Sequence, residues 1–248
     1  MNPTIIGSQI IRRDRVSSTN DEADLLLSKG QVDDGTVITT RYQKAGRGHL
    51  GTAWESEPGK NLLLSIIFKP GFLQPADQFY ISRVVALGAK DYIELYLDVA
   101  SIKWPNDIYV GDDKIAGILI ENVITGNQFT HAIGGLGINI NQTTFPEDIP
   151  NPTSLALILG FELDLNNSLE PLCSAMDVHY QNLRNGHMAT LDEQYNENLY
   201  RLEQWAFYRA DGASFEGKIL GVEPRGELLM ELRSGERRRF LFKELEYL

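Results

Sequence analysis

The chain has 248 residues, 42% of them hydrophobic, so it can hold one large domain with a small appendage. Its formal net charge of −11 at pH 7 argues against general nucleic-acid affinity, because binding to phosphates requires clustered lysine and arginine. The sequence has no run of 18 apolar residues and begins without an export-signal pattern, which predicts a soluble, cytoplasmic protein with no membrane partner. The single cysteine, Cys173, suits a reducing compartment and is expected to be a buried, unreactive thiol.

The predicted elements of the first 200 residues mix helices and strands. Ser18 or Thr19 is suited to cap a helix over 20–29, with Gly30 as its stop. Alternation and apolar spacing then predict two strands, a long helix, four more strands and three further helices. In chain order these elements span 35–42, 61–68, 76–97, the neighbourhoods of 101 and 108, 114–123, 128–136, 154–159, 168–184 and 191–203.

The tail from Trp205 changes to short strands that are separated by turns. Five short strands in about forty residues predict a small SH3-like β-barrel over 205–248. The mixed order of the preceding elements predicts an α+β domain over 1–204, with a mixed sheet and helices over one face. The basic cluster at 237–239 lies between acidic residues and is expected to be a solvated face.

The Lys-Trp-Pro-Asn-Asp run over 103–107 is the most informative motif. Proline disfavours helix at the preceding residue, so Trp104 is predicted to be extended at a strand end, with Asn106 and Asp107 in a turn. The bend brings together a cation, an indole, an amide and a carboxylate. It forms either an ordinary surface turn above a core tryptophan or part of a ligand site.

A glycine-rich loop over 46–54 follows a predicted strand. Three glycines in six positions permit positive φ and close approach of backbone to a ligand. Arg47 lies between two of them, so its guanidinium could reach an anion. The loop is either a flexible surface turn or an anion site. It is not a P-loop or a dinucleotide fingerprint, because the required ending and the following helix are missing.

Two further segments carry glycines within strands. The turn at 111–113 predicts a hairpin that places Lys114 at its mouth, near the 103–107 bend. Alone, such a lysine would usually be solvated. The run Gly-Gly-Leu-Gly-Ile-Asn-Ile-Asn over 134–141 indicates backbone that must admit a ligand, or an ordinary bulge at a strand end.

In this order and spacing, these segments resemble the catalytic domain of biotin–protein ligases. The resemblance rests on the 46–54 loop, the 103–107 run, the Lys-x-x-Gly-Ile-Leu strand from Lys114, the Gly-Ile-Asn turn at 137–139 and the early Ser-Thr-Asn motif at 18–20, and it covers 11–248. It implies a class II synthetase-like fold. Only 17 residues precede Ser18, so a form without an N-terminal DNA-binding domain is expected.

The resemblance also implies an activity. Such a ligase activates biotin with ATP and Mg²⁺ as biotinyl-5′-AMP and transfers the biotinyl group to a lysine of a biotin carboxyl carrier domain. Biotin, ATP and the carrier are therefore the expected partners, and the sequence leaves open whether the protein is a monomer or a homodimer. The tail shows no site chemistry of its own, so it is predicted to support the main domain or to help dock the carrier.

Site residues follow from the matching motif positions. The expected catalytic residues are Lys114, at the biotin carboxylate, Arg47, near the carboxylate and phosphate, and Asp107, which orders the site or acts as a base. The expected biotin-binding residues are Ser18, Thr19, Asn20, Gln43, Arg47, Gly48, His49, Lys114 and Gly117. The expected ATP-binding residues are Trp54, Lys103, Asn106, Asp107 and Asn139, and no metal ligand is indicated.

One departure from the family pattern stands out, because the common loop has arginines where this chain has His49 and Thr52. We therefore expect weaker retention of the adenylate, improving as the pH falls toward 6 and His49 becomes cationic. The competing interpretations are a lipoate–protein ligase, which shares the fold and the acyl-adenylate chemistry, and a biotin-sensing transcriptional regulator.

Overall fold

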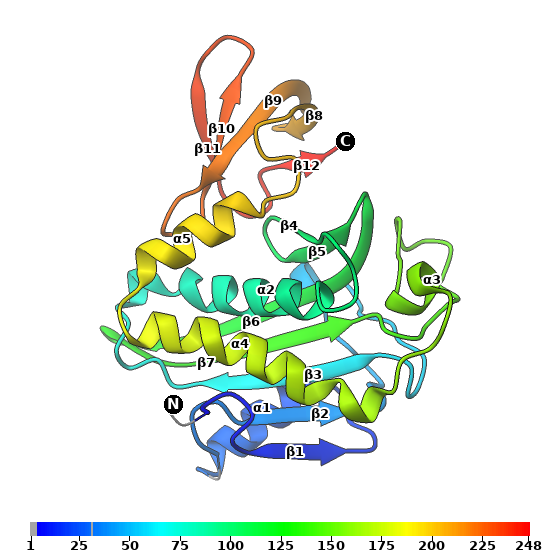
Figure 1. The fold of residues 1–248 in the computed structure, drawn as a ribbon. Helices are drawn as coiled ribbons and strands as arrows, with labels where there is room; N and C mark the ends of the chain where they lie inside the picture. Colours follow the sequence, from blue (N-terminus) through cyan, green and yellow to red (C-terminus); the bar gives the residue numbers. More distant parts are fainter. Residues whose placement is uncertain (1–3, 31) are drawn as a thin grey trace.

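The computed structural model describes residues 4–30 and 32–248 and contains two sheets (Figure 1). The larger sheet has seven strands in the order β1-β2-β3-β7-β6-β5-β4, in which β1 and β2 are parallel and the other neighbours antiparallel. Its strands are β1 (Ile10–Arg13), β2 (Val37–Thr40), β3 (Leu62–Phe68), β4 (Ser101–Lys103), β5 (Asp107–Val110), β6 (Asp113–Thr125) and β7 (Gln128–Ile138).

The smaller sheet has five antiparallel strands in the order β11-β10-β9-β8-β12 and lies at one end of the larger sheet (Figure 1). Its strands are β8 (Trp205–Ala210), β9 (Ala213–Val222), β10 (Leu228–Leu232), β11 (Arg237–Phe240) and β12 (Glu246–Tyr247). The helices are α1 (Thr19–Ser28), α2 (Phe79–Ile93), α3 (Leu155–Leu159), α4 (Leu169–Arg184) and α5 (Met188–Glu197). The predicted α+β class with a small C-terminal sheet is confirmed, whereas the division at 204/205 stays a prediction.

Strand β3 shows how the larger sheet is buried between helices. Leu64 and Ile66 belong to the main core with α2 and α4, whereas Ile67 belongs to a smaller core with Ala23 and Leu26 of α1. Successive side chains on a strand point to opposite faces, so α1 lies on the face opposite α2 and α4.

Local signals explain where α1 begins and ends. Ser18 is extended (φ −144°, ψ 146°), and its Oγ accepts a hydrogen bond from the Asn20 amide at 3.3 Å. Gly30 has φ 65° just beyond the helix, a conformation that costs glycine little. The predicted cap and stop of this helix are therefore confirmed.

Other boundaries differ from the sequence predictions. Helix α2 begins at Phe79, after a 3₁₀ turn over Pro75–Asp77, and ends at Ile93. Helix α5 runs from Met188 to Glu197 rather than over 191–203, because Arg201 (φ 57°) and Glu203 (φ 55°) are in left-handed conformations that a helix excludes. Strand β1 was not predicted; its four residues are too short for a periodicity to stand out.

Trp104 and Cys173 are both buried. The Trp104 indole is 2% exposed, and its Nε1 donates to the Gly226 carbonyl, in the turn between β9 and β10, at 2.9 Å. The turn after Lys103 comprises residues 104–106, and Asp107 is already the first residue of β5, one position earlier than predicted. Cys173 is 4% exposed, and burial raises its pKa to about 12, so the predicted unreactive thiol fits the structure.

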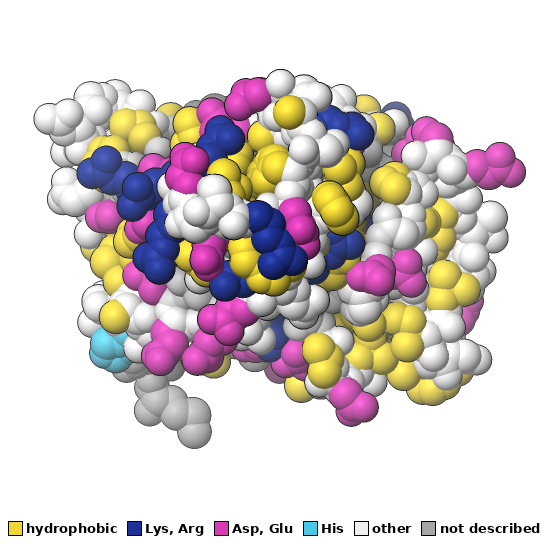
Figure 2. Space-filling view, turned by 90° about the horizontal axis from the view of Figure 1, so that it is seen from above, with side chains coloured by type: hydrophobic (Ala, Val, Ile, Leu, Met, Phe, Trp, Pro, Cys, Tyr) yellow, Lys and Arg dark blue, Asp and Glu magenta, His cyan; other side chains and the backbone are white. Residues whose placement is uncertain are grey.

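The smaller sheet carries mixed charges on its surface (Figure 2). Basic side chains of this region lie beside acidic ones, as predicted for a solvated face. The ion pairs are Arg209–Glu246, Lys218–Glu231, Arg233–Glu216, Arg238–Asp211 and Arg239–Glu223. Across residues 4–30 and 32–248, no helix combines the length and apolar character that crossing a membrane requires.

The buried guanidinium of Arg83 ties α2 to α5 and to the smaller sheet. It pairs with Asp192 of α5, and Nη2 donates to the Val222 and Glu223 carbonyls at 3.1 and 2.9 Å. Its side chain is fully buried, and its bonds add to others, because the Glu223 carbonyl also accepts from the Gly226 amide at 2.9 Å and Asp192 also accepts from Tyr80 Oη at 2.9 Å.

We predict that Arg83→Met lowers the free energy of unfolding by about 3 kcal/mol, because it leaves the Asp192 carboxylate without its cationic partner and removes one donor from each of two carbonyls. Denaturant unfolding measures the effect. Arg209→Ala, which breaks the exposed pair with Glu246, is the matched control and should cost less than about 1 kcal/mol. Equal losses for the two variants would contradict this assignment.

Candidate active site

A cavity of about 220 Å³ lies beside the N-terminus of α1. Strands β3, β6 and β7 contribute its floor, and the start of α1 and the 43–54 segment contribute its walls. All nine positions expected to bind biotin line it: Ser18, Thr19, Asn20, Gln43, Arg47, Gly48, His49, Lys114 and Gly117. The structure therefore brings together residues that are up to 99 positions apart in the sequence (18 to 117).

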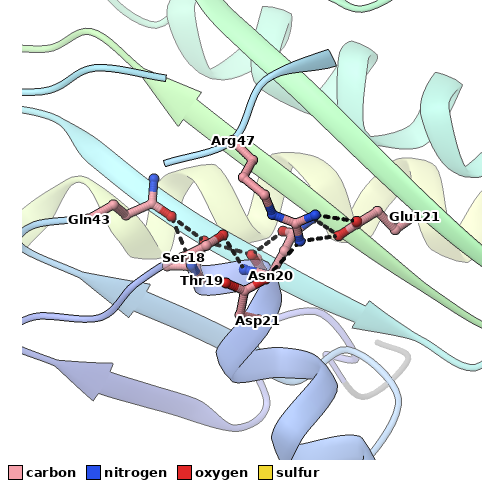
Figure 3. A network of polar contacts seen from close by, with 8 residues as sticks. Ser18, Thr19, Asn20, Asp21, Gln43, Arg47 and Glu121 are labelled. Atoms are coloured by element: carbon pink, nitrogen blue, oxygen red, sulfur yellow. Dashed lines mark hydrogen bonds and ion pairs between the residues drawn. The ribbon is translucent and has the colours of Figure 1, made fainter. Parts of the chain in front are cut away.

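A polar network fixes the side chains at the start of α1 (Figure 3). The amide of Thr19 donates to Gln43 Oε1 at 2.8 Å, and Asn20 Nδ2 donates to Glu121 Oε2 at 2.6 Å. Ser65 Oγ lies 2.7 Å from Thr19 Oγ1 and 2.6 Å from Asn20 Oδ1. Because both amide oxygens are engaged, the orientations of Gln43 and Asn20 are set before any ligand arrives.

Arg47 is held by two carboxylates (Figure 3). Its Nη1 and Nη2 atoms donate to Glu121 Oε1 and Oε2 at 2.9 and 3.0 Å, a bidentate arrangement. Nη2 also lies 2.9 Å from Asp21 Oδ1. These partners compensate the charge of Arg47 and fasten the glycine loop to β6 and α1. Its assignment to the carboxylate–phosphate region stays a prediction.

Glu121 and Ser65 are site residues that the sequence analysis missed. The alternation of side chains along β6 could have identified Glu121. It lies four residues after Gly117, and residues separated by an even number of positions in a strand share a face. Ser65 gives no such signal, since a serine within an apolar strand is common and its partners come from α1.

The indole of Trp54 lies against bare backbone of the sheet. A Cβ atom on Gly117 would be 2.6 Å from Trp54 Cζ3, and one on Gly137 would be 2.4 Å from Cε2. These glycines face each other in the register of β6 and β7. Any side chain at either position would displace the indole ring. The space above the two glycines is therefore occupied by Trp54 itself, and a ligand would lie beside the ring.

Beyond Trp54 lies a second cavity of about 590 Å³. It shares Thr52, Ala53, Trp54, Asp107 and Lys114 with the first cavity, so these residues form a common wall. Of the positions expected to bind ATP, Trp54, Lys103, Asp107 and Asn139 line the second cavity, and Asn106 lines the first. The two predicted groups of residues thus largely separate into two adjoining chambers.

Lys114 stands in the common wall and is ion-paired with Asp107 at 2.7 Å between Nζ and Oδ1. A β-bulge determines the face to which the Lys114 side chain points. Asp107 pairs with Gly117 but Tyr109 pairs with Lys114, so β6 has one more residue than β5 between these two pairs. The bulge turns Lys114 to the face that carries Asp107 and Gly117. The predicted hairpin, with Lys114 close to the 103–107 bend, is borne out.

The two asparagines expected at ATP both support backbone. Asn106 Nδ2 donates to the Ile118 carbonyl at 3.0 Å, and Asn139 Nδ2 donates to the buried Thr153 carbonyl at 3.0 Å. Their contacts hold the hairpin and the end of β7 in place. Their assignment to the nucleotide stays a prediction.

His49 lines the first cavity and contacts the segment between β11 and β12. Its ring centroid lies 6.0 Å from that of Phe242. Burial, then the neighbouring Lys243, lower the pKa of His49 below its ordinary 6.5, whereas Asp107 acts to raise it. The imidazole therefore becomes cationic at a lower pH than an ordinary histidine, and the expected improvement in adenylate retention as the pH falls toward 6 stays a prediction.

The chain matches known proteins over most of its length. The sequence profile of the biotin/lipoate A/B protein ligase family matches residues 13–139, more than half of the chain. The chain belongs to this family.

Relatives in the family are similar along nearly the whole chain. The bifunctional ligase/repressor BirA of Bacillus spizizenii is 28% identical over 93% of this chain and 72% of its own length. The biotin–[acetyl-CoA-carboxylase] ligase of Paracoccus denitrificans is 28% identical over 89% and 93%. The biotin protein ligase of Aquifex aeolicus, solved in complex with biotin and ATP, has the same fold, with a TM-score of 0.80, 24% identity and coverage of 97% and 100%.

We predict that the His49 imidazole titrates below pH 6.5 and that Lys243→Gln raises its midpoint, because the variant removes a nearby positive charge. NMR of the histidine ring protons over pH 4–8 measures both values. His131, whose pKa burial also lowers, is the internal control and should not respond to Lys243→Gln. An unchanged His49 midpoint in the variant would rule out the proposed proximity of the two groups.

Proposed function

We propose that this protein is an ATP-dependent biotin–protein ligase. It activates biotin as biotinyl-5′-AMP and transfers the biotinyl group to a lysine of a biotin carboxyl carrier domain. The observation that carries the proposal is the pair of adjoining cavities with a common wall of Trp54, Asp107 and Lys114. A reaction that joins two small molecules is accelerated when both are held with their reacting atoms close together, and two adjoining cavities can hold them in this way.

The first cavity suits biotin and the second suits ATP. A ureido ring needs hydrogen-bonding partners when it is buried, and the Ser18–Asn20 segment with Gln43 offers a fixed polar set. The second cavity has a flat aromatic wall in Trp54, against which an adenine could stack, and a cation in Lys103. The carboxylate of biotin and the α-phosphate would then meet beside Lys114.

The first chemical step joins two anions. An oxygen of the biotin carboxylate attacks the α-phosphorus, the bond to the bridging oxygen of the β-phosphate breaks, and pyrophosphate leaves. Lys114 stabilises the charge at the new acyl-phosphate oxygen, and Asp107, 2.7 Å away, holds its ammonium in place. Arg47 fixes the loop over the intermediate through Asp21 and Glu121, which limits access of water.

The second step transfers the biotinyl group. The neutral ε-amine of the carrier lysine attacks the acyl carbon, the bond to the AMP oxygen breaks, and the amide nitrogen loses its proton. Asp107 is engaged by Lys114, so we assign it to orientation of that lysine rather than to proton removal. AMP and water are suitable final acceptors for the proton.

Mg²⁺ fits this site as an ion that accompanies ATP. Within residues 4–30 and 32–248 there is no group of three or more histidine, cysteine, aspartate or glutamate side chains that could hold a metal by itself. Mg²⁺ is commonly bound by one or two carboxylates together with substrate phosphates, and Glu55, Asp107 and Asp148 line the second cavity. When bound, the ion would neutralise charge on the polyphosphate.

The direct test incubates the protein with biotin, ATP, Mg²⁺ and a carrier domain and measures the carrier by mass spectrometry. The expected result is the addition of one biotinyl group at a single lysine. A parallel reaction with lipoate in place of biotin tests the related ligase activity. Transfer of lipoate alone, or of neither group, would overturn the proposal. The absence of nucleic-acid binding stays a prediction, and the choice between monomer and homodimer is left open.

We predict that Lys114→Ala reduces the rate of adenylate formation by about 10²–10³-fold, the usual loss when one preorganised donor is removed from a site. Release of pyrophosphate measures this step. Thermal unfolding should change little, because the Lys114 side chain is partly exposed at a hairpin mouth. Lys44→Ala, at an exposed position outside the two cavities, is the control. Normal pyrophosphate release by a folded variant would remove Lys114 from the site.

We also predict that His49→Arg slows escape of biotinyl-adenylate. One charge-assisted hydrogen bond contributes ~1.5–3 kcal/mol, or roughly one to two decades in retention. The wild-type off-rate should fall as the pH decreases, and because the His49 pKa is lowered, the midpoint of that fall should lie below pH 6.5. Off-rates measured from pH 5 to 8 test this. Equal off-rates for wild type and variant would contradict the prediction.

A further inference from the structure

Three tyrosines surround the Lys103 ammonium in the second cavity. Nζ lies 4.4 Å from the ring centroid of Tyr109, 4.8 Å from that of Tyr247 and 5.8 Å from that of Tyr200. It also donates a hydrogen bond to Tyr109 Oη at 2.8 Å. We call Tyr109, Tyr200 and Tyr247 the tyrosine cage. Tyr109 therefore holds the ammonium chiefly through its hydroxyl oxygen, whereas an ammonium within about 6 Å of an aromatic face is attracted by the ring quadrupole.

The cage joins three separate parts of the chain. Tyr109 belongs to β5, Tyr200 follows α5, and Tyr247 lies in β12, the last strand of the smaller sheet. Tyr247 is placed by its pairing with Tyr208 of β8 and by the edge contact of the two rings at 5.3 Å. Residues of the smaller sheet therefore reach Lys103, although the sequence analysis assigned no site chemistry to the tail.

The cage holds Lys103 without neutralising it. Arg47 is paired with Asp21 and Glu121, and Lys114 is paired with Asp107. Within the described ranges, 4–30 and 32–248, no carboxylate lies within 4.0 Å of the Lys103 ammonium. Lys103 is thus the cation of the second cavity whose charge is left for an anionic ligand.

The tyrosines themselves remain uncharged. Burial raises the pKa of Tyr109 to about 12 and that of Tyr247 well above 10, so both rings are neutral phenols across the physiological range. The charged groups that face Lys103 are Asp107, Asp112, Lys114 and Arg201. Burial lowers the Lys103 pKa, and Asp107 partly restores it.

We propose that Tyr247 is a positioning residue that, with Tyr109 and Tyr200, holds the Lys103 ammonium in the second cavity for the phosphates of the nucleotide. The identity of the nucleotide rests on the proposed function; the cage itself does not. The C-terminal strand thereby becomes part of the nucleotide site rather than only a support for the main domain. A hydrophobic side chain of similar size at 247 would fill the space but provide no π face for the cation.

The cage is tested first without any ligand. In the full-length protein with ¹³C-labelled lysine, the Lys103 ε-CH₂ resonance should be shifted upfield by the ring currents of the tyrosines. Lys103→Arg assigns this resonance. Tyr247→Leu should move it toward the position of a solvated lysine, whereas Tyr247→Phe should retain the shift. An unshifted Lys103 resonance in the wild-type protein would overturn the proposal, and this result requires no variant to fold.

Nucleotide binding is tested second, by calorimetric titration with ATP and Mg²⁺ and separately with biotin. Tyr247→Leu should weaken ATP binding at least about fivefold and leave biotin affinity unchanged, and Tyr247→Phe should restore ATP binding. Phe215→Leu removes a partly buried aromatic ring elsewhere in the same sheet and serves as the matched control. Equal weakening by Tyr247→Leu and Phe215→Leu would assign Tyr247 to general stability and overturn the positioning role.

The two tests distinguish the failure of this inference from failure of the proposed function. If the wild-type protein shows the shifted Lys103 resonance but binds no ATP, the cage stands and the proposed ligase function falls. If ATP binds normally in Tyr247→Leu while the resonance moves, the cage exists but does not position Lys103 for the nucleotide, and the inference falls while the ligase function stands.

Discussion

A single row of cross-strand partners organises both cavities. Lys103 faces Asp107 across β4 and β5, Asp107 faces Gly117 across β5 and β6, and Gly117 faces Gly137 across β6 and β7. Partners in register share a face of the sheet, so the cation, the carboxylate and the bare backbone that carries Trp54 lie along one line. A slip of one residue in any of these pairings would turn part of the row to the opposite face, beneath α2.

The charge of the molecule is managed locally at this row. The chain as a whole has an excess of acidic residues, but the two cavities contain the cations Arg47, Lys103 and Lys114, and these cations differ in the side chains that hold them. Carboxylates bind Arg47 and Lys114 directly and reduce the field that a ligand would meet, whereas tyrosine side chains hold Lys103, which has no carboxylate within 4.0 Å of its ammonium among the described residues. The same contacts on an exposed surface would contribute little to stability or to ligand binding, because water and salt screen exposed charges.

Local rules were sufficient for much of the fold. The cap at Ser18, the alternation in β6 and β7 and the turn at 111–113 each depend on neighbours in the sequence, so they could be predicted from it. Motif resemblance then selected positions that line the two cavities.

What escaped prediction depends on contacts between distant segments. The end of α5 follows from left-handed residues that connect to the smaller sheet, and the direction of Lys114 follows from a bulge. The partners of Arg47 come from α1 and β6, and the effect of Lys243 on His49 comes from the tail. None of these contacts leaves a pattern in one stretch of sequence.

The three tryptophans occupy three different places, which has a consequence for spectroscopy. Trp54 lies in the wall between the cavities, Trp104 is buried where the sheets meet, and Trp205 lies beneath Arg233 in the smaller sheet, 3.9 Å from ring centroid to guanidinium carbon. Intrinsic fluorescence therefore has separate reporters for ligand contact, for separation of the two sheets and for unfolding of the smaller sheet. Single-tryptophan variants would resolve the order in which these regions lose structure.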